Sequence, residues 1–294
     1  MPAHKYTILQ ISIICFLVAV LGVRLVSQYP DWFNGAGRNF NGAQSTGRFI
    51  TLGSATSTED SGFLDYVLPI FRRATGLDVH VQAVGTGHAL AIGAQGAADA
   101  LLVHDRVGED TFVADGYGVD LRDVMYNDFV IVGPRFDPAG IQGMRDAREA
   151  FAQIAATGAL FASRGDSGGT YRMELRLWKS AGIEPDGHTW YRSLDQSVGQ
   201  TLNFAAAVNA YALTDRATWA NFKNRLNLEI LAEGDPVLLN FYGSILVKPV
   251  RWPDVKYAYA ETWHRWLTSR AGLDAITSYR IDGEEVFFPP RARL

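Results

Sequence analysis

Short apolar runs that end in small residues and lead into helical patterns recur along this chain. The runs at residues 49–52, 77–84 and 159–162 are each typical of a strand, and each precedes a loop rich in Gly, Ser or Thr and then apolar residues at helical spacing. Such alternation predicts an α/β fold. Open α/β sheets bind ligands beyond the carboxyl ends of their strands, so these loops are the candidate site.

The loop at residues 163–170 carries the strongest chemical signal. It contains Arg164, Ser167, Thr170 and three glycines, and a helical pattern follows it. Glycines let the backbone approach a ligand, hydroxyls and free amides donate hydrogen bonds, and a helix N-terminus carries partial positive charge. With the charge of Arg164, this indicates capture of a compact anion. Asp166 would repel an anion, so we expect it to cap the following helix or to orient Arg164.

A second hydroxyl-rich loop, residues 53–60, follows the first strand. Ser54, Thr56 and Ser57 lie in it, immediately before a helical pattern. Capping a helix requires only one such side chain, so we expect the others to serve a ligand. Thr86 occupies the corresponding place after the strand at residues 77–84 and joins the candidate set.

Two further expectations concern structure alone. Pro69 lies inside the helical pattern that follows residues 53–60 and should kink or shorten that helix. His104 follows the third strand, at residues 98–103, and we interpret it as a structural histidine.

The 294 residues, 48% of them hydrophobic, suffice for two lobes. A strand at residues 128–134 ends in Gly-Pro, which is typical of a crossing between lobes, and the turn at residues 234–236 suits a return crossing. We therefore expect one lobe at residues 49–132 plus 235–294 and a second at residues 133–234. A cleft between them would be lined by strand-to-helix loops from both.

The N-terminus predicts export. An apolar stretch at residues 7–23 follows Lys5 and is closed by Arg24. It is slightly shorter than the roughly 20 residues of a membrane-spanning helix and longer than many signal-peptide cores. Residues 1–28 are therefore either a cleaved signal peptide or an uncleaved membrane anchor, and the folded part is expected in the periplasm or another extracytoplasmic space. Residues 29–48, rich in Asn, Gly and Gln, predict a flexible linker.

Composition excludes several classes of protein. The formal net charge of −4 gives no electrostatic case for nucleic acid. The one cysteine, Cys15, lies in the N-terminal segment, which excludes disulfides and Cys-ligated metals from the folded part. Residues 165–169 spell the nucleophile segment of chymotrypsin-like serine proteases, but the chain lacks their all-β pattern and an evident His-containing partner segment. A serine hydrolase with Ser167 as nucleophile is kept as an alternative. We assign no catalytic residue, no metal and no cofactor.

Several segments match one known family: residues 56–58, 84–87, 101–104, 122–134, 163–166 with 169–170, and 210–218. The run at residues 122–134 is long and idiosyncratic, so the match is specific. From about Arg48 to its C-terminus the chain resembles the periplasmic tungstate-binding proteins of ABC importers. The resemblance implies a two-lobed type II periplasmic binding protein fold that captures tungstate, or molybdate, between its lobes. It also implies an ABC permease and its ATPase subunits as partners, and we expect a monomer.

The resemblance also implies a ligand set. Ser54, Thr56 and Ser57 fall on the hydroxyl segment of the family, and the arginine loop supplies Arg164 and Thr170. In that loop Ser167 stands where the family has an acid and Gly168 where it has a serine, so one hydroxyl has moved by a position. The full candidate set is Ser54, Thr56, Ser57, Thr86, Arg164, Ser167 and Thr170.

Other functions remain open at this level. Phosphate and sulfate binding proteins also use helix N-termini, and monoprotonated phosphate additionally needs an acceptor, for which Asp166 is the evident candidate. An uncleaved anchor would also suit a membrane-tethered sensor domain, although the sequence contains no signalling module.

Overall fold

The computed structural model describes residues 47–290. The description below concerns the unit Gln44–Leu294, to which all of the described residues belong. The predictions for residues 1–28 and for almost all of the linker lie outside the described residues. Within the described part, no helix combines the length and hydrophobicity needed to span a membrane.

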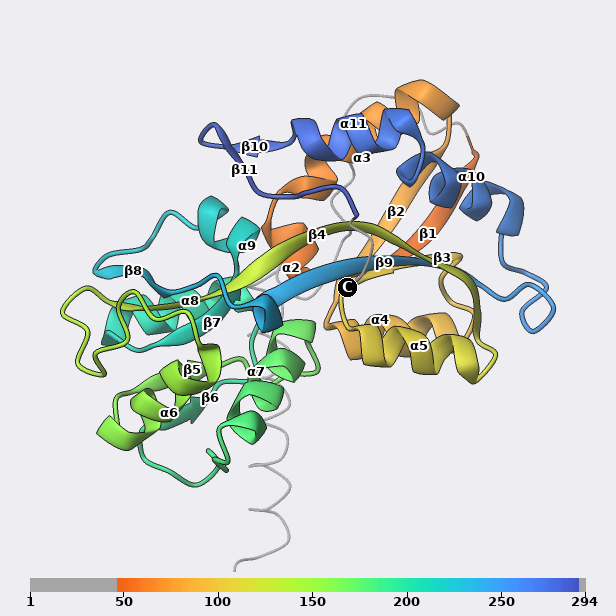
Figure 1. Cartoon of the computed structure of the whole chain (residues 1–294). Helices are drawn as coiled ribbons and strands as arrows, with labels where there is room; N and C mark the ends of the chain where they lie inside the picture. The colour runs from red at the N-terminus through yellow and green to blue at the C-terminus, as the bar shows by residue number, and fades with distance from the viewer. Residues whose placement is uncertain (1–46, 291–294) are drawn as a thin grey trace, which may run out of the picture. The chain divides into compact units, whose positions relative to one another are not determined.

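Strands and helices alternate as predicted (Figure 1), which confirms the α/β class. The strands are β1 (Phe49–Ala55), β2 (Asp78–Val84), β3 (Ala100–Val103), β4 (Gly118–Pro134), β5 (Phe161–Ser163), β6 (Tyr191–Ser193), β7 (Ala212–Asp215), β8 (Leu228–Ala232), β9 (Leu239–Val247), β10 (Arg280–Ile281) and β11 (Glu284–Glu285). The helices are α2 (Thr56–Asp60), α3 (Phe63–Thr75), α4 (Thr86–Ala94), α5 (Arg106–Ala114), α6 (Ala147–Thr157), α7 (Gly169–Ser180), α8 (Val198–Val208), α9 (Arg216–Asn221), the 3-10 turn η1 (Pro236–Leu238), α10 (Tyr257–Leu267) and α11 (Arg270–Ser278).

The long strands β4 and β9 connect the whole sheet, whose order is β2-β1-β3-β9-β4-β7 with β8 also paired to β4. β1 is parallel to β2 and β3, whereas β9 runs antiparallel to β3 and β4. The first half of β4 pairs with β9 as far as Asp128, and from Phe129 onward β4 pairs with β7. Figure 1 shows β4 and β9 running together, with α3, α10 and α11 on one side of them and α4 and α5 on the other.

Strand β3 has buried side chains on both of its faces. In β3, Ala100 and Leu102 join a core with α3, α10 and α11, while Leu101 and Val103 join a second core with α4 and α5. Burial on both faces explains why this strand is continuously apolar and does not alternate. We call β1, β2, β3, β9 and the first half of β4, with these helices, lobe 1.

The second half of β4 repeats this arrangement. Phe129 and Ile131 pack with α6 and α7, while Val130 and Val132 pack with α8. We call this half of β4, strands β5 to β8 and helices α6 to α8 lobe 2. Helix α9 lies at the junction, because Ala217 belongs to the core of lobe 1 and Trp219 to that of lobe 2.

Two local features differ from expectation. Helix α3 continues through Pro69, and the break lies earlier, at Gly62, whose φ of 76° requires glycine and separates α2 from α3. Pro69 is tolerated because it is exposed, so the carbonyl that it leaves unbonded can be hydrated. The lobe boundaries stay a prediction, but the change of strand partner between Asp128 and Phe129 favours a first crossing a few residues before Gly133.

Candidate functional site

Three helix N-termini from both lobes meet at the candidate site. Helix α2 begins directly after β1, α4 one residue after β2, and α7 after the arginine loop of lobe 2. The Gly87 N–H donates to the Ser167 carbonyl across the lobes at 3.0 Å. A Cβ on Gly85 would lie 3.3 Å from the Gly168 nitrogen, so the start of α4 lies directly against the start of α7. Each N-terminus presents N–H groups without helical partners, an arrangement that favours anions.

Arg164 lies among these helix starts with only 2% of its surface exposed. Its Nη2 donates to Thr56 Oγ1 of lobe 1 at 3.2 Å and to Asp166 Oδ2 at 2.5 Å. Asp166 Oδ1 in turn accepts from the Gly168 N–H at 2.9 Å. Of the two expected roles of Asp166, the structure shows the second: its carboxylate bonds the Arg164 guanidinium, while α7 has no side-chain cap and Asp166 instead closes the turn before it.

Two glycines allow this close packing. A Cβ on Gly168 would lie 2.6 Å from Arg164 Cζ, so any side chain there would displace the guanidinium. A Cβ on Gly169 would lie 2.8 Å from the His104 ring and 3.0 Å from the His104 carbonyl oxygen. The departure from the family pattern at position 168 thus provides the space in which Arg164 lies.

Several buried donors have no partner within residues 47–290. Those in the segments that form the candidate site are Thr58 Oγ1, Thr86 Oγ1, Thr170 Oγ1 and Arg164 Nε, and the others belong to Tyr242, Trp252, Trp263, Trp266 and His264. Leaving a buried polar group unpaired costs about 1–3 kcal/mol, and more for a charged group. Thr86 and Thr170 are the first or second residues of α4 and α7, so their hydroxyls lie where helix N–H groups also need an acceptor. Such a site suits a group that only accepts hydrogen bonds.

The other predicted residues divide into two groups. Thr56 accepts from Arg164, which leaves its own proton free, and Ser167 is exposed with its Oγ against Gly85. Ser54 Oγ instead donates to the Leu102 carbonyl at 2.9 Å, and Ser57 Oγ lies 2.7 Å from His104 Nε2. Thr56 therefore contacts Arg164, and Thr86, Ser167 and Thr170 belong to the helix starts that meet beside it, whereas Ser54 and Ser57 have partners within the protein.

Sequence reasoning did not include three residues that the structure places beside the site. Thr58 lies in the same run of hydroxyl residues as Thr56 and Ser57, so the sequence could have indicated it. His104 is buried and hydrogen-bonded at both ring nitrogens, which agrees with a structural histidine, but nothing in the sequence indicated its contact with Ser57. Burial raises the pKa of Asp60 to about 6, with the charge of Arg164 and the Gly199 N–H partly offsetting the rise.

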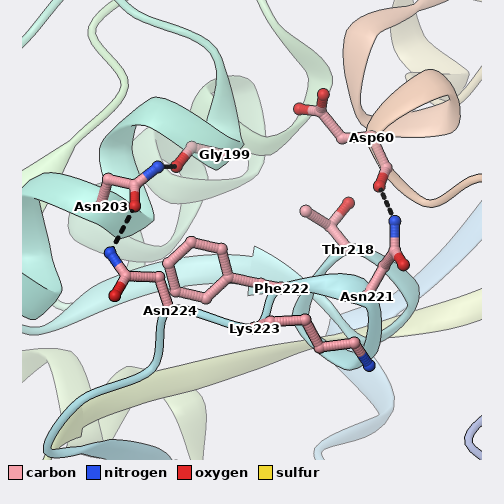
Figure 2. A pocket seen from close by; sticks show the side chains of 8 residues that line it. All are labelled: Asp60, Gly199, Asn203, Thr218, Asn221, Phe222, Lys223 and Asn224. Atoms are coloured by element: carbon pink, nitrogen blue, oxygen red, sulfur yellow. Dashed lines mark hydrogen bonds between the residues drawn. The ribbon is translucent and has the colours of Figure 1, made fainter.

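Asp60 lies at the contact of α2 with α8 and α9. Its carbonyl accepts from Asn221 Nδ2 at 2.8 Å, and Asn203 Nδ2 donates to the Gly199 carbonyl at 3.0 Å (Figure 2). These residues line an open pocket of about 270 Å³, with Thr218, Phe222, Lys223 and Asn224 completing its wall. The pocket exposes side-chain amides and backbone carbonyls but does not include Arg164, so it is separate from the candidate anion site.

A second interlobe contact is ionic. Asp105, 2% exposed, accepts from Arg172 Nη1 at 2.7 Å and from Arg176 Nη1 at 3.2 Å. Asp105 immediately precedes α5 of lobe 1 as its N-cap residue, whereas both arginines lie on α7 of lobe 2. The two lobes are therefore in contact in this structure.

Two lobes joined by paired long strands, with unpartnered donors at their junction, define the class of two-lobed solute-binding proteins. Comparison with known proteins agrees. A model of the PBP superfamily domain matches residues 41–271. A tungstate-binding protein TupA from Peptoclostridium acidaminophilum is 40% identical over 248 residues, 83% of this chain and 86% of that protein.

Solved structures give the same result. The tungstate ABC transporter structure from Geobacter sulfurreducens is 46% identical, with a TM-score of 0.72 over 79% of this chain and 98% of that one. The tungstate-binding protein TupA from Desulfovibrio alaskensis G20 is 39% identical, with a TM-score of 0.71 over 83% of this chain and all of that one. The chain belongs to the PBP superfamily, in the family that includes the TupA proteins. The predicted two-lobed type II fold is confirmed.

This fold also bears on the hydrolase alternative. The nucleophile segment of chymotrypsin-like enzymes belongs to a double β-barrel, which this α/β sheet is not. Among the described histidines none hydrogen-bonds Ser167, and His104 pairs with Ser57.

Proposed function

We propose that this protein captures tungstate, and with it molybdate, between its two lobes and delivers the anion to an ABC permease and its ATPase subunits. The observations that carry the proposal are the buried Arg164 with its unpartnered Nε and the unpartnered hydroxyls of Thr86 and Thr170, which belong to the two helix starts that meet beside this arginine. A tetrahedral dianion has only acceptors, so it would satisfy all of these donors at once. The names of the relatives support tungstate as the anion.

The proposed ligand set is Thr56, Thr86, Arg164, Ser167 and Thr170, with the N–H groups that begin α4 and α7. Ser54 and Ser57 were predicted as ligands, but their hydroxyls bond within the protein, so we propose that they support the site without donating to the anion. Closure would bring the set together, because Thr56 and Thr86 belong to lobe 1 and the other three to lobe 2.

Phosphate is the less suitable anion. Monoprotonated phosphate needs an acceptor for its proton, and Asp166, the evident candidate, directs its carboxylate oxygens at Arg164 and the Gly168 N–H. Tungstate and molybdate at neutral pH carry no proton and need no such acceptor. We also propose that the protein binds its anion without transforming it, since its named relatives are binding proteins, and that it acts as a monomer.

Delivery to an importer requires a place outside the cytoplasm. We propose that residues 7–23 direct or anchor the chain there.

Titration calorimetry of the purified protein with tungstate, molybdate, sulfate and phosphate tests the proposal. We expect binding of tungstate and molybdate, and at least 100-fold weaker binding of sulfate and phosphate, the factor that corresponds to about 2.7 kcal/mol. No heat with tungstate would refute the proposal. Tight phosphate binding would transfer it to that anion.

A further inference from the structure

A ring of buried polar groups, most of them hydrogen-bonded to their neighbours, links the long strands β4 and β9 to the first turn of α2. Asn127 of β4 and Asn240 of β9 face each other as Cα partners, and Asn240 Nδ2 donates to Asn127 Oδ1 at 2.7 Å. Asn127 Nδ2 donates to Asp215 Oδ1 at 3.0 Å, and His104 Nδ1 lies 3.0 Å from Asn240 Oδ1. All four side chains are at most 4% exposed.

The ring continues through the candidate site. His104 Nε2 lies 2.7 Å from Ser57 Oγ, and Thr218 Oγ1 lies within hydrogen-bond distance of both the Ser57 carbonyl oxygen, at 3.3 Å, and Asp215 Oδ2, at 2.5 Å. Ser57 is the second residue of α2 and follows Thr56, which accepts from Arg164. The ring therefore reaches the turn that contacts the arginine.

The donor and the acceptor of each of these hydrogen bonds can be assigned by starting from Asp215. Asp215 also accepts from the Thr218 N–H, and a carboxylate can only accept, so Asn127 must turn its NH₂ toward it. Asn127 Oδ1 then faces the NH₂ of Asn240, which leaves Asn240 Oδ1 to accept from His104 Nδ1. A neutral imidazole carries one N–H proton, so Nε2 has none. It must therefore accept a hydrogen bond from the Ser57 hydroxyl.

The surroundings keep His104 neutral. Burial, together with the charges of Arg164 and Arg176, lowers the pKa of His104 to about 4, although the bond to Asn240 and the charge of Asp105 oppose the shift. The N-terminus of α7 lies against the ring at Gly169 and also disfavours a positive charge there.

We propose that His104 is a positioning residue of the anion site and that the Asn127–Asn240 pair fixes it in the Nδ1-protonated tautomer. In this form His104 accepts a hydrogen bond from the Ser57 hydroxyl. Because that proton is used, Ser57 fixes the position of the first turn of α2 and does not donate to the anion. The geometry of the crossing strands is thereby transmitted to Thr56 and Arg164. The affinity part of this inference rests on the proposed anion function, whereas the tautomer does not.

The tautomer is tested by long-range ¹H–¹⁵N NMR of the full chain at neutral pH. We expect His104 to carry its proton on Nδ1, and a proton on Nε2 would overturn the proposal. In Asn240→Leu, which removes the acceptor for Nδ1–H, we expect the Nδ1 tautomer to lose its dominance. If the Nδ1 tautomer stayed dominant in a folded Asn240→Leu protein, the proposal would also be overturned, because Asn240 would then not determine the tautomer.

The link to binding is tested by a double-mutant cycle with tungstate. We expect Ser57→Ala and His104→Gln each to weaken binding by roughly ten-fold, the effect of one lost hydrogen bond, and the double variant to be no weaker than the poorer single variant. Losses that add would make Ser57 an independent ligand and refute the proposal.

Ser61→Ala is the matched control. Ser61 Oγ donates to the Thr58 carbonyl, in the same segment but outside the ring, so we expect no change in affinity. A loss as large as that of Ser57→Ala would show a general loosening of α2 and refute a specific role for His104. If the unmodified protein binds no tungstate, the proposed function fails, and the NMR experiment alone decides the tautomer.

Discussion

Replacing Gly168 by alanine gives the sharpest test of the anion site, because its consequence is set by a single close approach. The new Cβ would lie 2.6 Å from Arg164 Cζ and 2.8 and 2.9 Å from the two terminal nitrogens. Ordinary contact begins at 3.4 Å, so the guanidinium would have to retreat by about 0.8 Å. The backbone at position 168 has φ −70° and ψ 155°, which alanine adopts freely, so no backbone strain contributes.

A retreat of this size would disrupt the 3.2 Å bond to Thr56. Overpacking of this kind costs about 1–3 kcal/mol, which corresponds to roughly 5- to 150-fold weaker tungstate binding if it falls on the bound form. If the same cost also destabilises the protein without ligand, the melting temperature of the free protein decreases and the affinity does not change. Calorimetry and thermal unfolding of the same preparation separate the two cases.

Gly199→Ala serves as the control. Its Cβ would meet only Asp60, at an ordinary 3.5 Å, and Gly199 lies in the first turn of α8 much as Gly168 precedes α7. We expect unchanged affinity and a melting temperature equal to or above that of the unmodified protein. A Gly168→Ala protein that matches the unmodified protein in both affinity and melting temperature would refute the placement of Arg164.

Three further outcomes follow from the same site. Arg164→Ala should weaken tungstate binding at least ten-fold, since a buried charge-assisted bond contributes about 1.5–3 kcal/mol, and an unchanged calorimetric affinity would remove Arg164 from the ligand set. Thr170→Val should weaken binding yet leave the free protein as stable or more stable by about 1 kcal/mol, because it deletes an unpaired buried hydroxyl; lower stability without ligand would instead assign Thr170 a structural bond. Burial raises the pKa of Glu174 from 4.5 to about 7, so the folded state binds this proton more tightly and stability should fall as pH rises from about 4.5 to 7. Glu174→Gln removes this pH dependence. In urea unfolding, the free energy of unfolding of the variant should therefore rise relative to that of the unmodified protein between pH 5 and 7.5. Stability curves that stay parallel over this range would contradict the assignment.

The sequence predicted the α/β class, the two lobes and the arginine loop because each depends on local patterns. Strand-to-helix loops are visible as small residues after apolar runs, and the arginine loop has an unusual composition. Asp166 could be assigned because a carboxylate beside a buried arginine has few other roles.

What the sequence could not predict depends on which way side chains point and on distant partners. Ser54 and Thr56 look alike in the hydroxyl run, yet Ser54 is still in β1 and bonds to the neighbouring strand β3, while Thr56 opens α2 and meets Arg164. The contact of His104 with Asn240 joins residues 136 positions apart in the chain. Gly-Pro at residues 133–134 suggested a crossing, and these two residues are the last of β4, where they pair with β8.

The position of β9 has a consequence for how the molecule is assembled during synthesis. β3 and the first half of β4 both pair with β9, whose residues 239–247 come after all of lobe 2. Until they have been made, β3 lacks a neighbour on one side and exposes unpaired backbone groups. Lobe 1 therefore cannot complete its sheet on a nascent chain, although four fifths of the protein already exists, and any truncation before residue 247 leaves an edge prone to aggregation. These pairings between distant segments also predict slow folding, with lobe 2, whose strands β5 to β8 are continuous in the chain, as the part able to form first.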